Sequence, residues 1–267
     1  MSALATPARV GVSVGVLLRQ WRQRRRLSQL SLALEAGVSA RHLSFLETGR
    51  ANPSRDMVLQ LADTLDVPLR ERNLLLLAAG FAPAYPARPL DDPDLKPIRA
   101  ALDTVLAGYQ PYPALVVDRG WQLLAANDAV ALLTAGARAD LLEPPVNVLR
   151  LSLHPGGLAG RIVNLAEWRG HVLHRLAREA TASGAPELIA LHRELVGYSG
   201  GLHPSSPGGP AVAVPLRLRT GSGELSLISM VTTFGTPLDV TAAELSIEAF
   251  LPADTVTPEA LQNWSAP

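Results

Sequence analysis

The first third of the chain alternates short amphipathic segments with sharp breaks. In the first segment, apolar residues recur at positions i, i+3, i+4 and i+7, on one face of a helix: Val14, Leu17, Leu18 and Trp21. Three later segments each begin at a residue type that caps helix N-termini well: Ser28, Ser39 and Ser54. Gly37 and Gly49 follow the second and third segments, as residues that end helices. The pattern predicts five short helices between residues 13 and 80, the fifth from about 70 to 79.

The second half of the chain mixes helical and strand patterns. Helical patterns cover residues 98–108, 127–134 (with Asn127 or Asp128 as the cap), 158–182 and 186–196. Short apolar runs bounded by turn residues predict strands at 113–117, 121–125, 211–219, 224–234 and 245–251. Because strands lie at both ends with helices between them, we expect one antiparallel sheet covered by helices, an α+β arrangement.

A Pro-rich stretch separates the two halves. Residues 83–97 contain five prolines and three aspartates. Proline fixes φ and removes a backbone donor, so this composition is typical of a linker or an extended arm. The expected organisation is a helical domain over residues 1–82, a linker over 83–97 and an α+β domain over 98–267.

The charge distribution follows the same division. The whole chain has 24 Lys and Arg against 24 Asp and Glu, which gives a net charge of zero. Residues 1–82 carry 11 basic and 6 acidic groups, whereas the rest carries 13 basic and 18 acidic groups. The halves therefore have net charges of +5 and −5. A basic first half fits binding to phosphates, and an acidic second half would be repelled by a DNA duplex.

Several classes of protein are excluded by composition. The chain has no cysteine, so disulfides, Cys-ligated zinc and iron–sulfur clusters are excluded. The longest uncharged stretch, residues 195–216, is interrupted by Gly and Pro and does not fit a membrane span of about 20 apolar residues. Residues 1–10 contain a single Arg9 with no apolar segment after it, unlike a secretory signal. We expect a cytoplasmic protein without membrane insertion.

Two of the predicted helices are joined by a tight turn, in the spacing Ser28-Gln29-x-x-Leu32-Ala33-x-x-x-Gly37-Val38-Ser39. In a helix-turn-helix the first helix crosses the DNA backbone and the second enters the major groove. Around this motif the sequence closely resembles the Xre/Cro-type repressor family, over about a quarter of the chain. The matching positions are Leu18-Arg19-x-x-Arg22, Leu27-Ser28-Gln29, Gly37-Val38-Ser39, Leu43, Glu47-x-Gly49, Pro53-Ser54 and Leu61-Ala62-x-x-Leu65-x-Val67.

This resemblance implies roles for particular side chains. Four residues would face the major groove: Ala40, Arg41, Ser44 and Phe45. Among them, Arg41 would read guanine in a bidentate manner, and Phe45 or Ala40 would touch a thymine methyl group. Phosphates would be bound by Gln29, Ser39, Arg50 and Asn52. Arg22 and Glu47 correspond to a family ion pair between the first and third helices, which is a structural role.

Other interpretations of the first domain remain open at this stage. A five-helix, Arg-rich domain also fits a protein-interaction module with a solvated basic face. The run Arg24–Arg26 fits phosphate anchors or a solvated helix end equally well. Phe45 departs from the usual polar reading residue and also fits packing against the linker.

The second half carries a further resemblance, to the MmyB-like regulators. It rests on four groups of residues: Val116-x-Asp118-x-x-Trp121-x-Leu123-x-Ala125-Ala126-Asn127, Asn147-x-Leu149-Arg150-Leu151, His154-Pro155 and Phe250-Leu251-Pro252-Ala253-Asp254. The resemblance implies a PAS-like domain that binds a small apolar ligand such as a fatty acid. It implies no other cofactor.

A few large side chains in the second half are candidates for the lining of a ligand pocket. Ligand pockets are mostly apolar with a few polar anchors, which suggests Trp121, Trp168, Met230 and Phe234 as lining residues. Each of these side chains also fits ordinary core packing. Because this domain is acidic, a fatty acid would need a local donor, for which Arg150 is the candidate.

Two enzyme-like patterns are weak. Residues 197–201 match G-x-S-x-G, but a helix precedes them, a Pro/Gly loop follows, and no acid lies between the serine and His203. Glu167, His171 and His174 share one helix face without an evident fourth ligand, so a solvated face fits better than a metal site.

The sequence predicts an all-α helix-turn-helix DNA-binding domain followed by an α+β PAS-like domain with an antiparallel sheet. The expected function is that of a DNA-binding transcription regulator, not an enzyme. It would bind double-stranded DNA as a homodimer and sense a small apolar ligand. The alternatives are a catalytic or partner-binding second domain, with the helix-turn-helix serving for targeting or autoregulation.

Overall fold

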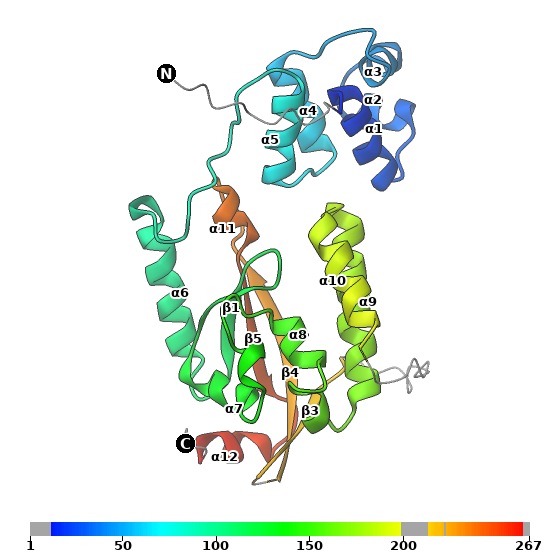
Figure 1. Cartoon of the computed structure of the whole chain (residues 1–267). Helices are drawn as coiled ribbons and strands as arrows, with labels where there is room; N and C mark the ends of the chain where they lie inside the picture. The colour runs from blue at the N-terminus through cyan, green and yellow to red at the C-terminus, as the bar shows by residue number, and fades with distance from the viewer. Residues whose placement is uncertain (1–11, 199–212, 222, 264–267) are drawn as a thin grey trace, which may run out of the picture. The chain divides into compact units, whose positions relative to one another are not determined.

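A computed structural model describes residues 12–198, 213–221 and 223–263 (Figure 1). The chain divides into two compact units. Among the described residues, the first contains those up to Ala87 together with residues 238–240, and the second contains those within 88–237 and 241–263. Within the described residues, no helix is long and apolar enough to cross a membrane.

The first unit is a cluster of short helices: α1 (Val14–Arg24), α2 (Gln29–Glu35), α3 (Ala40–Glu47), α4 (Arg55–Thr64) and α5 (Leu69–Ala78). The serine before each of α1 to α4 accepts a hydrogen bond from the N–H group three residues further on. These side chains satisfy donors that have no partner inside the helix. Local sequence signals therefore define where these helices begin, as predicted for the helices that start at Ser28, Ser39 and Ser54.

The core of the first unit is built largely from leucines. Eight of them are fully buried: Leu18, Leu32, Leu43, Leu46, Leu61, Leu65, Leu75 and Leu76. In the apolar run at the end of α5, by contrast, Leu74 and Leu77 are exposed. Helices α1 and α3 approach closely at Gly15, where an added Cβ would lie 2.2 Å from the carbonyl oxygen of Leu46. Glycine is therefore required at this crossing.

The beginning of the Pro-rich stretch packs on α5 instead of leaving the first unit. The Asn73 side-chain oxygen accepts hydrogen bonds from the N–H groups of Ala84 and Tyr85, and its amide donates to the Tyr85 carbonyl. At the other end, a 3-10 turn (Pro93–Leu95) leads directly into α6 (Lys96–Gly108). The domain boundaries drawn at residues 82 and 98 remain predictions.

The second unit contains a five-stranded antiparallel sheet, which confirms the predicted fold class. Its strands are β1 (Ala114–Val117), β2 (Leu123–Ala126), β3 (Leu216–Thr220), β4 (Gly223–Thr233) and β5 (Ser246–Pro252), in the spatial order β2-β1-β5-β4-β3. The register places Glu248 of β5 opposite Leu115 of β1 and Val231 of β4. Because neighbouring residues of a strand point to opposite faces, Glu248 and Phe250 share a face that Ala249 does not.

Helices cover both faces of this sheet. On one side, Leu102 and Leu106 of α6 pack against Val116 and Ala249. On the other side lie α8 (Val148–Leu153), α9 (Leu165–Ser183) and α10 (Pro186–Val196), as Figure 1 shows. Shorter helices complete the unit: a 3-10 turn (Asp128–Val130), α7 (Ala131–Thr134), two further 3-10 turns (Ala139–Leu141 and Ala159–Arg161), α11 (Val240–Glu244) and α12 (Thr257–Gln262). The larger core therefore lies between the sheet and α8 to α10.

Several local predictions for the second unit were wrong. The strand expected from residue 121 begins at Leu123, because Trp121 has a φ of +63°. The strand expected from residue 211 begins, within the described residues, at Leu216. The helix expected from residue 158 begins at Leu165, because Ile162 pairs with Leu218 of β3 and the Asn164 side chain bonds the backbone of residues 215 and 217. Asn127 does not cap the following helix with its side chain. Its amide instead bonds the backbone of residues 106, 112 and 114. Helices α8, α11 and α12 were not predicted, and each is only five or six residues long.

Candidate DNA-reading surface and ligand cavity

Helices α2 and α3 form the helix-turn-helix. Gly37 has a φ of +64°, a conformation that favours glycine, and the N–H of Val38 bonds back to the Ala33 carbonyl. The chain can then turn sharply into α3, whose N-terminus is capped by the Ser39 hydroxyl. The turn predicted from the Gly-Val-Ser sequence is thus present.

Two predicted reading residues of α3 contact each other on its outer surface. Arg41 is exposed, and its guanidinium carbon lies 5.4 Å from the centre of the half-buried Phe45 ring. A cation over an aromatic face is attracted by the ring quadrupole, while the N–H groups at the guanidinium edge stay available. Ala40 and Ser44 are half-buried. Core contacts on this helix come from Leu43 and Leu46, which point the other way.

The predicted phosphate-binding residues differ in whether their side chains already make hydrogen bonds within the protein. Arg50 and Asn52 are exposed directly after α3. The Ser39 hydroxyl accepts a hydrogen bond from the His42 N–H and so has a capping role. The Gln29 amide donates to the Glu47 carboxylate at 2.8 Å. Phosphate binding by these four residues stays a prediction. For Gln29, a phosphate would compete with Glu47 for the side-chain amide.

Arg22 and Glu47 form the expected ion pair between α1 and α3. The Arg22 Nε and Nη2 atoms donate to the two Glu47 carboxylate oxygens at 2.6 and 2.8 Å, and Nη1 donates to the Leu27 carbonyl. The Glu47 side chain is 2% exposed. Burial raises the pKa of its carboxyl, but hydrogen bonds from Arg22 and Gln29 outweigh that effect, so the pKa lies below its ordinary value. This pair fixes the position of the reading helix.

The arginine run after α1 is partly structural. Arg25 donates from Nε to the Leu65 carbonyl at 2.7 Å and also bonds the Asp66 carbonyl, at the C-terminal end of α4. Arg24 stacks on the Trp21 ring, with its guanidinium carbon 4.8 Å from the ring centre. Neither a phosphate anchor nor a solvated helix end describes Arg25, because its guanidinium bonds the end of α4.

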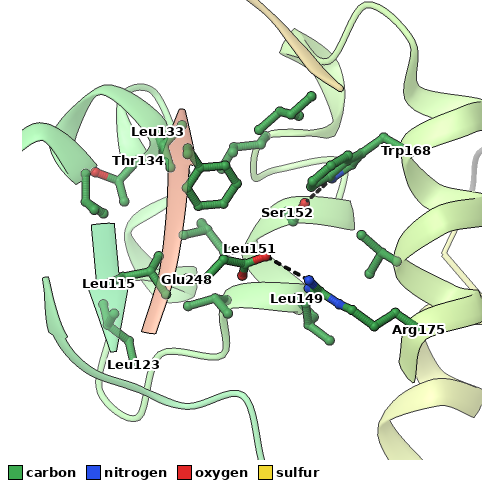
Figure 2. A pocket seen from close by; sticks show the side chains of 16 residues that line it. Leu115, Leu123, Leu133, Thr134, Leu149, Leu151, Ser152, Trp168, Arg175 and Glu248 are labelled. Carbon is green, nitrogen blue, oxygen red and sulfur yellow. Dashed lines mark hydrogen bonds and ion pairs between the residues drawn. The ribbon is translucent and has the colours of Figure 1, made fainter. Parts of the chain in front are cut away.

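An apolar cavity lies in the second unit between the sheet and the helices opposite it. It encloses about 50 Å³. Its wall consists mainly of apolar side chains: Leu115, Leu123, Val130, Leu133, Val148, Leu149, Leu151, Leu158, Trp168, Val172, Leu216 and Phe250. Its polar lining comes from Thr134, Ser152, Arg175 and Glu248. Figure 2 shows the Trp168 indole bonded to the Ser152 hydroxyl, at 2.9 Å, on one side of this space.

Of the five predicted pocket residues, this lining includes Trp168 alone. Trp121 is buried nearby and donates from its indole to Glu179. Met230 pairs with Ala249 of β5 and is 40% exposed, while Phe234 packs with the cluster that includes α6. Arg150 forms a bidentate pair with Glu194 at 2.7 and 2.8 Å. The expectation that these five side chains surround one space therefore needed correction.

The polar group that the sequence interpretation missed is the Arg175–Glu248 pair. Arg175 of α9 donates from Nη1 to a Glu248 carboxylate oxygen at 2.9 Å, and Glu248 is 3% exposed in the middle of β5 (Figure 2). The only sequence signal for Arg175 was its position two turns after Trp168 on the same helix. The pair joins residues 73 positions apart, so chain order gave no indication of it.

The metal interpretation of the α9 face has no support from the side-chain arrangement. Among the described residues, no three His, Asp or Glu side chains are grouped so as to hold a metal ion. The His171 ring instead lies 5.6 Å from the Trp168 ring, centre to centre, and burial lowers its pKa. Residues 199–201 of the G-x-S-x-G match lie outside the described residues.

Comparison with known families agrees with this architecture. Residues 98–263 match the sequence model of the MmyB-like transcription regulator ligand binding domain, and residues 18–72 match a helix-turn-helix model. The chain belongs to the MmyB-like transcription regulators. It is a DNA-binding transcription regulator with a ligand-binding second unit.

Comparisons with individual proteins add little to the family assignment of this MmyB-like regulator. No curated protein matches the sequence. Among solved structures, an RNA-binding light-oxygen-voltage receptor matches at 15% identity with a TM-score of 0.29. The match covers 94% of this chain and 60% of that receptor chain.

Proposed function

We propose that this regulator reads a specific operator through α3, with Arg41 and Phe45 as the main base-contacting side chains. The stacked pair of Arg41 and Phe45 on the outer face of α3 carries the proposal. Arginine matches the two acceptors of guanine in the major groove, and an apolar ring matches the thymine methyl group. Stacking also restricts the Arg41 side chain before DNA arrives, which lowers the entropy lost on binding.

We further propose that two copies bind one operator. Helix-turn-helix proteins read two half-sites about one DNA turn, roughly 34 Å, apart when they act as dimers. The short α3 helix contacts only a few base pairs, so a second copy is needed for a longer recognition sequence. The expected operator is an imperfect palindrome.

For the second unit, the proposed ligand is a small apolar molecule of the fatty acid type. Leucine-rich walls and a single ion pair fit a ligand with a hydrocarbon chain and one polar end. Ligand sites usually enclose roughly 300–1,000 Å³. Because the cavity encloses about 50 Å³, a chain would enter only as leucine side chains change rotamer. Ligand binding would thus alter the packing between the sheet and α8 and α9.

Phosphate contacts by the first unit predict a steep dependence of DNA affinity on salt. Each phosphate contact contributes about −0.9 to the slope of log K against log salt. Arg50→Gln is expected to weaken binding and make the slope less steep by about 1. Fluorescence anisotropy measures both the affinity and its salt dependence, with a DNA duplex taken from the region upstream of the protein's own gene. Arg99→Gln, in α6 of the second unit, is the matched control and should leave the slope unchanged. A shallow wild-type slope, unaffected by Arg50→Gln, would contradict phosphate binding by this surface.

A further inference from the structure

Helix α9 carries an open polar groove of about 430 Å³ in addition to the apolar cavity. Its lining comes from one side of the helix: His171, His174, Arg175, Arg178, Glu179 and Ala182. Arg175 also lines the apolar cavity, and it is the residue common to both linings. The Arg175–Glu248 pair therefore lies at the boundary between a polar groove and an apolar space.

Arg175 has hydrogen-bonding capacity that the protein does not use. Its Nη1 group bonds Glu248, and its guanidinium lies over the Trp121 ring with a carbon-to-centre distance of 4.4 Å. Its Nε atom is buried and has no hydrogen-bond partner among the described residues. A buried donor without an acceptor costs free energy, so native proteins rarely contain one without a functional reason. An oxygen atom of a ligand would satisfy this donor while Glu248 keeps its own bond.

The other charged groups of the groove set its preference for a ligand. Arg178 is exposed, and no hydrogen bond or ion pair engages its guanidinium within the described part of the chain. Glu179 is the acidic residue of the same groove, and its carboxylate accepts a hydrogen bond from the Trp121 indole N–H. Burial raises the pKa of Glu179, against the smaller lowering effects of this hydrogen bond and of Arg175. Glu248 pairs directly with Arg175, whereas the Arg178 guanidinium is exposed in the groove and can contact an added negative charge.

We propose that the groove on α9 is the head-group site for an amphipathic acid whose chain occupies the apolar cavity. The carboxylate accepts hydrogen bonds from Arg175, and Arg178 supplies the balancing charge. This inference rests on the proposed apolar ligand of the second unit and adds an orientation and a charge requirement to it. It assigns to Arg175 and Arg178 the role that the sequence suggested for Arg150.

Binding of decanoate and of decanol to the full chain separates the two proposals. The two probes have the same chain, but only decanoate has a carboxylate. Isothermal titration calorimetry should show decanoate binding more tightly than decanol to the wild type. Arg175→Gln combined with Glu248→Gln, which leaves no buried charge unpaired, is expected to weaken decanoate roughly 10-fold or more, because a hydrogen bond to a charged group is lost. Decanol binding by the same variant should stay within about twofold, which also shows that the cavity is intact.

Arg178→Gln provides a second test on an exposed side chain that the fold does not need. It is expected to weaken decanoate about threefold or more and to leave decanol unchanged. The head-group site would be overturned if decanoate and decanol bound the wild type equally and the variants affected both probes to the same extent or not at all. The proposal of an apolar ligand would still hold in that case. Failure of both probes to bind the wild type would overturn the apolar ligand itself, and the head-group site with it.

Discussion

Glu47→Ala is expected to lower the free energy of unfolding of the first unit by about 3–5 kcal/mol, as for other buried pairs that lose one partner. The Arg22 guanidinium, whose side chain is 11% exposed, would keep its charge without the carboxylate that accepts two of its hydrogen bonds. Gln29 would lose its acceptor at the same time. Since the pair joins α1 to α3, the reading helix would lose its fixed position, and DNA affinity would fall with stability.

Hydrogen–deuterium exchange on the full chain measures this effect in each unit separately. Amides of α1 to α5 should exchange faster in Glu47→Ala, and those of the second unit should not change. The control is Glu35→Ala, an exposed glutamate on α2, which is expected to change stability by no more than about 0.5 kcal/mol. The combined change Arg22→Met with Glu47→Leu should recover much of the loss, because no buried charge remains. A loss below about 1 kcal/mol in Glu47→Ala would show that the pair does not hold α3 in place.

Trp168→Ala is expected to lower the free energy of unfolding of the second unit by about 3–5 kcal/mol, the range for removing a large buried aromatic side chain. The Trp168 side chain lines the apolar cavity and is 3% exposed. Its loss also leaves the Ser152 hydroxyl without its indole partner. The same change enlarges the cavity, so apolar molecules should bind the variant more tightly than the wild type.

Thermal unfolding with and without decanol tests both parts of this expectation. A ligand that binds only the folded state stabilises the protein, and the stabilisation grows with the logarithm of the ligand concentration divided by Kd. Decanol should therefore raise the Tm of Trp168→Ala by more than that of the wild type. Trp168→Phe retains most of the ring and loses the indole N–H, and it should cost much less stability. Equal destabilisation by the two changes, with no gain from decanol, would contradict the placement of Trp168 at the ligand cavity.

The first unit was predictable because its signals are local. Each serine cap acts within three residues of its helix, and Gly37 acts through its own φ angle. Arg41 and Phe45 are four residues apart on one helix, so their contact follows from helical geometry. The role of Asn73 was not predictable, because it depends on a fold-back of residues 84 and 85 onto α5.

The cavity was less predictable, because its residues come from elements distant in the chain. Whether Met230 faces the cavity depends on strand register, and its partner Ala249 lies on the sheet face that packs against α6. Short α8 has too few residues to show a clear period, although it supplies Leu149, Leu151 and Ser152 to the wall. The sequence interpretation favours three aromatic side chains with Met230 and Arg150, whereas leucine is the most frequent residue of the wall.

Selection of binding sites from random duplex DNA, with the full-length wild type and Arg41→Ala, tests the central claim most directly. The wild type should enrich two related half-sites about one DNA turn apart, with a preferred guanine in each. Arg41→Ala should lose discrimination at that guanine by about 1–3 kcal/mol and keep the other positions. Enrichment of no sequence by the wild type, or an identical preference in Arg41→Ala, would contradict operator reading through α3.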